Sequence, residues 1–250
     1  MIIQNTIDDL LQQLLLKIQS ILSNQFVGMY IGGSIANNSF NDETSDIDCY
    51  IVMTASLSKS VIHKIEEIHK KFYVSKILYA KKIEASYIPK HDLLNFNPSN
   101  IRPYFNEGNF FLADYGSNFI IELYMLREKG ITIAGPDIKT LIKKISVVDL
   151  KLAIQKNLDE YWKPVLNDLE KLKRNDYQVF AILTMCRTLY TLETGMIASK
   201  TEAAQWAIKN INPDWKDLIE KSLFWKPNQV FNRLEETQQF IKYVINRNII

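Results

Sequence analysis

Apolar residues recur at helical spacing near the start of the chain and throughout its second half. Between residues 10 and 22, leucine and isoleucine fall on one face of a helix, with polar residues on the other. After residue 148 the same spacing returns, with little strand signal. The helices expected there cover residues 150–172, 177–194, 200–210 and 234–249.

The region between these helical parts carries shorter apolar runs, rich in residues that favour strands. The runs cover residues 26–31, 47–53, 83–88 and 119–125, and a helix is expected at 57–72. Strands separated by helices predict an α/β or α+β first half, and we expect a small mixed sheet with helices there. We therefore expect an α/β domain over residues 1–145 and an all-α helical bundle domain over residues 146–250.

Two positions mark element ends in this scheme. Gly195 follows a long helical stretch, where a left-handed residue commonly ends a helix. Asp137 follows Gly135-Pro136, and we expect its side chain to cap the next helix.

Composition narrows the class of protein. The chain has 250 residues, 23% of them charged, and a formal net charge of +2. We therefore do not expect strong electrostatic binding of nucleic acid. Cys49 and Cys186 lie far apart, which favours neither a disulfide framework nor a zinc site. We expect a cytoplasmic protein, because the chain lacks a signal peptide and a run long enough to span a bilayer.

The residues that carry chemistry lie between the first two predicted strands. Asp46 and Asp48 are two residues apart where a strand begins, so their carboxylates project from the same face. Two such carboxylates repel each other unless a cation lies between them, and oxygen ligands of this kind suit Mg²⁺. Upstream, Gly32-Gly33-Ser34 permits a tight turn, a close approach to a phosphate and a hydroxyl contact.

Each of these pieces alone is common, because an isolated Asp-x-Asp is often a loop or a helix cap. Their order is more specific: strand, Gly-Gly-Ser, about a dozen residues, Ser45-Asp46-Ile47-Asp48, and then an apolar strand. This order resembles the signature of the polymerase-β-type nucleotidyltransferase superfamily. The resemblance implies a nucleotidyltransferase domain.

Enzymes of this superfamily usually take a third carboxylate from a neighbouring strand. Glu84 is the best candidate, because it alternates with Ile83, Ala85 and Tyr87 and so points away from their face. The alternative is a solvent-facing glutamate on an edge strand.

The second half carries a resemblance of its own. Residues 183–195 and 198–207 resemble the C-terminal helical domain of bacterial aminoglycoside adenylyltransferases of the streptomycin/spectinomycin kind, and residues 126–137 are also similar to that group. The likeness covers most of the chain, except the first helix and the stretch between Asp92 and Asn118. It implies transfer of AMP from ATP to a hydroxyl of an aminoglycoside or aminocyclitol antibiotic, and thereby resistance.

The resemblance also implies roles for particular residues. It places the active site between the two domains, with two Mg²⁺ ions. The positions that match the family's metal ligands are Asp46, Asp48 and Glu84, and Glu84 also matches its general base. The positions that match its triphosphate-contacting serines are Ser34 and Ser45, and we expect Gly33 to lie against the same phosphates. Lys221 and Tyr243 match a lysine and a tyrosine that contact the nucleotide; the alternative is a surface lysine and a half-buried tyrosine.

The acceptor is where this chain departs from the pattern. Leu189 and Thr194 stand where streptomycin-modifying members carry a tryptophan and an acid, and residues 91–98 do not match the family's aromatic and acidic stretch. We therefore expect a small hydroxylated cation, spectinomycin ahead of streptomycin, as the partner of ATP. We expect a monomer, with no nucleic acid and no membrane involved. The alternatives are a non-antibiotic small molecule, a tRNA or protein hydroxyl, and a binding module without catalysis.

Overall fold

The computed structural model describes residues 2–247, and the chain divides into two compact units. One, which we call the sheet unit, comprises the chain up to Phe40 together with Ser45–Lys144. The other, the helical unit, comprises Asn41–Thr44 and the chain from Ile145 onward. None of the helices within the described residues is both long and apolar enough to cross a bilayer.

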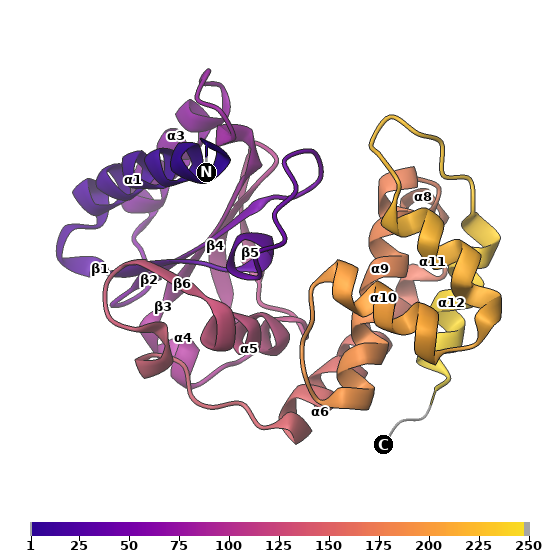
Figure 1. Cartoon of the computed structure of the whole chain (residues 1–250). Coiled ribbons are helices and arrows are strands. Elements are labelled where there is room, and N and C mark those ends of the chain that lie inside the picture. The colour runs from indigo at the N-terminus through magenta and orange to yellow at the C-terminus, as the bar shows by residue number, and fades with distance from the viewer. Residues whose placement is uncertain (1, 248–250) are drawn as a thin grey trace. The chain divides into compact units, whose positions relative to one another are not determined.

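The sheet unit is built on one six-stranded mixed sheet in the order β5-β4-β3-β2-β1-β6 (Figure 1). Strands β2 and β3 run parallel, and every other neighbouring pair is antiparallel. The strands are β1 Phe26–Ile31, β2 Ile47–Met53, β3 Ile83–Pro89, β4 Ile101–Asn106, β5 Asn109–Asp114 and β6 Ile131–Ala134.

Helices α1 and α3 lie side by side against one face of this sheet (Figure 1). The helices of the unit are α1 Ile2–Leu22, α2 Gly33–Ala36, α3 Lys59–Tyr73, α4 Lys90–Leu94 and α5 Phe119–Lys129. The unit also contains the single 3₁₀ turns η1 Ser23–Gln25, η2 Ala80–Lys82 and η3 Ile138–Thr140.

Alternation along the strands gives the sheet two unlike faces. Cys49, Ile51, Ala85, Tyr87 and Phe105 pack into the apolar core with α1 and α3, and we call their side the core face. The residues between them point the other way. We call that side the polar face; its members on β2, β3 and β4 include Asp48, Tyr50, Glu84, Ser86 and Tyr104.

The helical unit centres on the apolar helix α9, against which α10, α11 and α12 pack (Figure 1). Its elements are α6 Val147–Asn157, the π-helical turn η4 Leu158–Trp162, α7 Lys163–Val165, α8 Leu169–Leu172, α9 Asn175–Thr194, α10 Lys200–Asn210, η5 Pro213–Trp215, α11 Lys216–Leu223 and α12 Leu234–Ile245. Gly195 ends α9 with a left-handed φ of 72°, as predicted. Asp137 also caps as predicted, since its side chain accepts from the amide of Lys139.

Some predicted elements were wrong. The strand expected at residues 119–125 is helix α5, which buries Phe119, Leu123 and Leu126 at helical spacing. The single helix expected at 150–172 is broken into α6, η4, α7 and α8. Strands β4, β5 and β6 and helix α11 were missed. The helix expected at 234–249 ends at Ile245, and residues 248 and 249 lie outside the described part of the chain.

Candidate active site

The register of two parallel strands sets two carboxylates side by side. Asp48 on β2 and Glu84 on β3 are direct partners, so their side chains leave the sheet on the same face. Asp46 lies just before β2 and is exposed, while Asp48 and Glu84 are half-buried. Strand β3 pairs with both β2 and β4, so the alternative of Glu84 on an edge strand is wrong.

Both the burial of Glu84 and the charges of its neighbours change the pKa of its carboxyl. Burial raises the pKa of its carboxyl to about 8, and the charges of Asp48 and Asp46 add to the rise. Glu122 on α5 acts in the same direction more weakly. A group in this state is stable as a neutral acid until a cation arrives, so the arrangement favours binding of positive charge.

The Gly-Gly-Ser turn lies directly against Asp48. The amide of Gly32 donates to the carbonyl of Asp48 at 3.0 Å. Gly33 has a φ of +56°, and a Cβ atom on it would lie only 2.6 Å from the Asp48 Cγ. Only glycine meets both conditions, because other residues rarely adopt this φ and any side chain would displace the carboxylate.

The two predicted serines differ in their surroundings. The Ser34 hydroxyl oxygen is buried and has no hydrogen-bond partner among the described residues. A buried hydroxyl without a partner is costly and points to a ligand atom that completes it. Ser45 is half-buried, and its carbonyl accepts from the Lys82 ammonium at 3.0 Å.

The donor set suits a hard cation such as magnesium. Within residues 2–247, no three His, Cys, Asp or Glu side chains are gathered closely enough to hold a metal by themselves. Mg²⁺ seldom requires such a cage, since it binds through one or two carboxylates and fills its shell with water and substrate phosphates. Adjacent carboxylates beside a glycine turn, with an unsatisfied serine hydroxyl, fit that mode of binding.

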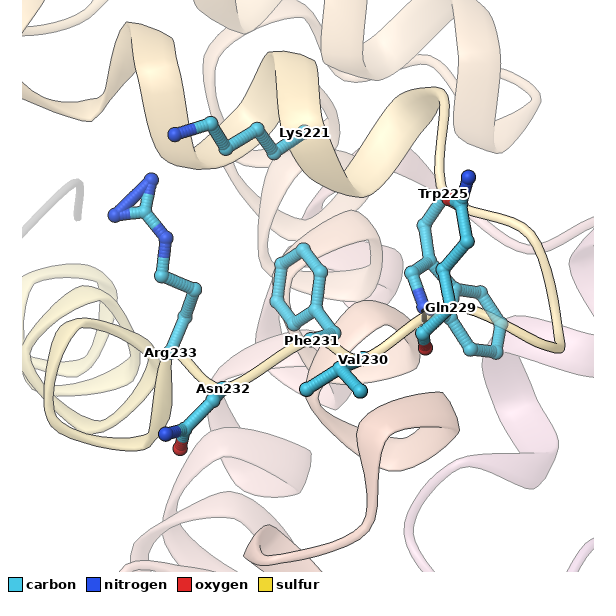
Figure 2. A pocket seen from close by; sticks show the side chains of 7 residues that line it. All are labelled: Lys221, Trp225, Gln229, Val230, Phe231, Asn232 and Arg233. Atoms are coloured by element: carbon cyan, nitrogen blue, oxygen red, sulfur yellow. Dashed lines mark hydrogen bonds between the residues drawn. The ribbon is translucent and has the colours of Figure 1, made fainter.

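Lys221 lies in the helical unit, at the edge of a pocket of about 330 Å³ (Figure 2). The nitrogen ends of Lys221 and Arg233 lie toward each other at one side of this pocket, and Trp225 lies at the other (Figure 2). The Lys221 ammonium donates to Asp217 at 3.0 Å, and Arg233 pairs with the same carboxylate. The pocket is lined by Lys221, Trp225, Gln229, Val230, Phe231, Asn232 and Arg233. A phosphate contact by Lys221 would therefore compete with Asp217.

Tyr243 is half-buried on α12. Its ring packs against Trp215 and Phe240, with ring centroids 5.5 and 6.2 Å away. Its hydroxyl accepts from Arg247 at 3.3 Å. The packing gives Tyr243 a structural role whether or not it contacts a nucleotide.

Two residues of α9, Leu189 and Thr194, differ from the pattern of the streptomycin-modifying enzymes, and neither is charged. Leu189 is fully buried in the helical unit, and the Thr194 hydroxyl donates to the carbonyl of Tyr190 at 2.7 Å. Neither residue offers a carboxylate to a cationic acceptor.

Two residues near the carboxylates were missed by sequence reasoning. Tyr50 lies two positions after Asp48 on the polar face, and the same alternation that united Asp46 and Asp48 could have found it. Burial, followed by the charges of Glu122, Asp48 and Glu84, raises the pKa of Tyr50 well above its usual value. Glu122 could not have been placed, because its segment was predicted as a strand.

Comparison with known proteins agrees with this picture. Residues 140–248 match the family model described as aminoglycoside adenylyltransferase, C-terminal domain. A spectinomycin 9-adenylyltransferase of Staphylococcus aureus is 26% identical over 209 residues, 78% of this chain and 76% of the relative. Residues 140–248 therefore carry the C-terminal domain of the aminoglycoside adenylyltransferases, and most of the chain is similar to enzymes of that kind.

Other relatives extend the match along the chain. An aminoglycoside (3'') (9) adenylyltransferase of Klebsiella pneumoniae is 24% identical over 243 residues, 91% of this chain and 89% of that protein. The crystal structure of an Enterococcus spectinomycin adenyltransferase with ATP and spectinomycin superposes with a TM-score of 0.71. It is 24% identical, and the match covers 94% of this chain and 96% of that one. The expected fold, a mixed-sheet domain followed by a helical one, is thereby confirmed.

Proposed function

We propose that this chain transfers AMP from ATP to a hydroxyl of an aminocyclitol antibiotic, with spectinomycin ahead of streptomycin, and so confers resistance. The observation that carries the proposal is the cluster of Asp48 and Glu84 against the Gly33 turn, within a chain similar to enzymes of this kind. Relatives named for spectinomycin in three species, 25–27% identical, support the acceptor class.

Each residue of the cluster has a defined task in this scheme. Asp46 and Asp48, with help from Glu84, would hold two Mg²⁺ ions, whose charge neutralises the triphosphate and the leaving pyrophosphate. Gly33, Ser34 and Ser45 would hold the triphosphate, and the unsatisfied Ser34 hydroxyl supports this. These residues act by positioning and charge neutralisation, as is general for phosphoryl transfer.

Glu84 would take the proton from the acceptor hydroxyl as its oxygen attacks the α-phosphorus and the bond to pyrophosphate breaks. A carboxyl with a pKa near 8 is mostly protonated at neutral pH and cannot act as a base. Positive charge beside it favours the carboxylate. Glu84 would therefore become a base only when the magnesium nucleotide is bound.

We also propose Lys221 and Tyr243 as nucleotide contacts. Lys221→Ala should weaken ATP binding more than acceptor binding, and more so at low salt, because water and ions screen the exposed ammonium. Lys216→Ala is the control, since Lys216 also forms an i,i+4 ion pair on α11. Equal ATP affinities for the two variants would reject the assignment of Lys221.

The order of the two antibiotics follows from charge. Thr194 supplies no carboxylate, and a lost charge-assisted contact costs roughly 1.5–3 kcal/mol, about ten- to a hundredfold in affinity. Streptomycin carries two guanidinium groups, so the loss should weigh more on it than on spectinomycin. We propose that the chain acts as a monomer in a reducing cytoplasm, where its buried Cys49 and Cys186 stay free thiols.

The test combines an assay of nucleotide transfer with a measurement of bacterial growth. Pyrophosphate release should be measured from ATP, GTP, CTP and UTP with spectinomycin, streptomycin and other aminocyclitols, and the Asp48→Asn variant serves as the inactive control. In a susceptible bacterium, the chain should raise the inhibitory concentration of spectinomycin more than that of streptomycin. Protection against streptomycin alone would reverse the order. Protection against neither, with nucleotide transfer still measurable, would point to a different acceptor.

A further inference from the structure

Strands β2 and β3 start together, and the segments just before them carry the residues of interest. The first parallel pair is Ile47 with Ile83, so Asp46 and Lys82 both lie outside the ladder. Asp46 is exposed and has no strand geometry of its own. The backbone of the turn before β2 therefore decides where its side chain begins.

Lys82 holds that turn. Its ammonium donates to the Ser45 carbonyl at 3.0 Å, across 37 positions of sequence. The side chain of Asn41 orders the same turn from within, since its carbonyl oxygen accepts from the amides of Glu43 and Thr44 at 2.9 and 3.2 Å. Those two bonds tie the turn to itself, whereas the Lys82 bond ties it to the start of β3.

The chemistry of the position favours a lysine. Lys82 is half-buried at the end of the 3₁₀ turn η2, so its ammonium is partly shielded from water and its hydrogen bond is stronger than on an open surface. Asp46 and Asp48 bring negative charge to the start of β2, which a neighbouring ammonium offsets.

We propose that Lys82 is a positioning residue, whose ammonium holds the Ser45–Asp46 backbone at the start of β3 in the geometry that magnesium-bound ATP requires. The inference rests on the proposed function and adds a residue to it. Lys82 acts through Ser45 and Asp46 and does not itself enter the reaction.

Lys81 provides a matched control for substitutions of Lys82. It is the adjacent residue with the same side chain, but it is exposed, and its ammonium nitrogen lies 5.9 Å from the centre of the Tyr73 ring. Lys81→Met and Lys82→Met therefore remove the same charge from neighbouring positions. Lys82→Arg keeps a charged donor and should rescue the turn in part.

The first measurement needs no activity. Amide hydrogen exchange of residues 41–49 in the ligand-free protein should be about ten- to a hundredfold faster in Lys82→Met, because a charge-assisted hydrogen bond is lost. Lys81→Met should exchange like the wild type, and Lys82→Arg should fall between. Unchanged exchange in Lys82→Met, or equal effects of the two methionine variants, would overturn the proposal. If Lys82→Met does not fold, Lys82→Gln replaces it, since the amide keeps a donor without the charge.

The second measurement links the turn to the nucleotide. The affinity for a non-hydrolysable ATP analogue with Mg²⁺ should fall about tenfold or more in Lys82→Met, with little change in Lys81→Met. Equal affinities would overturn the link to the nucleotide. If the wild type transfers AMP to no acceptor while the exchange difference holds, the proposed function fails and the role of Lys82 in the turn stands.

Discussion

The two faces of the central sheet are built from alternate residues of the same strands, yet the titratable groups on the two faces have different surroundings. On the core face, His69 of α3 is fully buried, donates to or accepts from the Tyr87 hydroxyl at 2.7 Å and stacks on Phe105. On the polar face, Glu84 lies beside Asp48 with its pKa raised to about 8.

Burial drives both groups to their neutral forms, because desolvation lowers the pKa of His69 to about 3 and raises that of Glu84. The histidine is surrounded by core, so it stays neutral at physiological pH. The glutamate keeps carboxylate neighbours, so a cation can reverse its state. The comparison teaches that an apolar core and a reactive site can share one sheet when their residues alternate.

The sharpest test of this contrast uses two adjacent residues of β2. Asp48→Asn removes a proposed metal ligand, and a bound metal ion is worth several kcal/mol of transition-state stabilisation, so transfer should fall by about a thousandfold or more. Cys49→Ser leaves activity unchanged but places a hydroxyl in the core, at a cost of about 1–3 kcal/mol in the free energy of unfolding. Pyrophosphate release and urea melts measure the two effects. Normal turnover by Asp48→Asn with Mg²⁺ would break the comparison.

Glu84→Gln should lower kcat about 10²- to 10⁴-fold while ATP still binds, because the general base is lost. The raised pKa means that the folded state resists ionisation, so between pH 4.5 and 8 Glu84 destabilises the fold increasingly as pH rises. The ligand-free variant should therefore be more stable at pH 7 by on the order of 3 kcal/mol. A loss in kcat of less than severalfold would return Glu84 to an ordinary half-buried residue.

Gly33→Ala tests the fit between the glycine turn and Asp48. Gly116→Ala is the control, since Gly116 has a φ of +66° and nothing within 4 Å of an added Cβ. Both variants should lose about 1–2 kcal/mol of stability from the left-handed backbone. Only Gly33→Ala should also lose activity, by about tenfold or more, because its methyl group displaces a carboxylate. Equal kcat/KM values would show that Asp48 moves aside without consequence.

The core face predicts a change in stability with pH that leaves activity at neutral pH untouched. His69 has an ordinary pKa of 6.5 when unfolded and about 3 when folded, so the unfolded chain binds the proton first. Its stability is intact above pH 6.5 and is lost as pH falls toward 3, by about 2 kcal/mol between pH 7 and pH 5. In His69→Phe this part of the acid sensitivity should vanish. His63→Phe should retain it, because the His63 side chain is 70% exposed.

Several features of the fold could be predicted from local pattern alone. The helices over 177–194 and 200–210 lie within one or two residues of α9 and α10, because their apolar spacing and the Gly195 end signal are local properties. Residues 119–125 could not be assigned, because a short apolar run suits a buried strand as well as a helix. Strand β5 was missed for a related reason: much of it is exposed, so it lacks a clear alternating pattern.

For the site, the sequence by itself determined which residues share a face and a turn. Spacing of two unites Asp46 with Asp48, and the double glycine marks a close backbone approach, because both follow from local geometry. Only the tertiary structure decided that Glu84 pairs with Asp48 across the two parallel strands, and that Lys82 donates a hydrogen bond to the Ser45 carbonyl. Those relations depend on the register between strands separated by a helix. That register is set by packing of the whole core, and no local pattern encodes it.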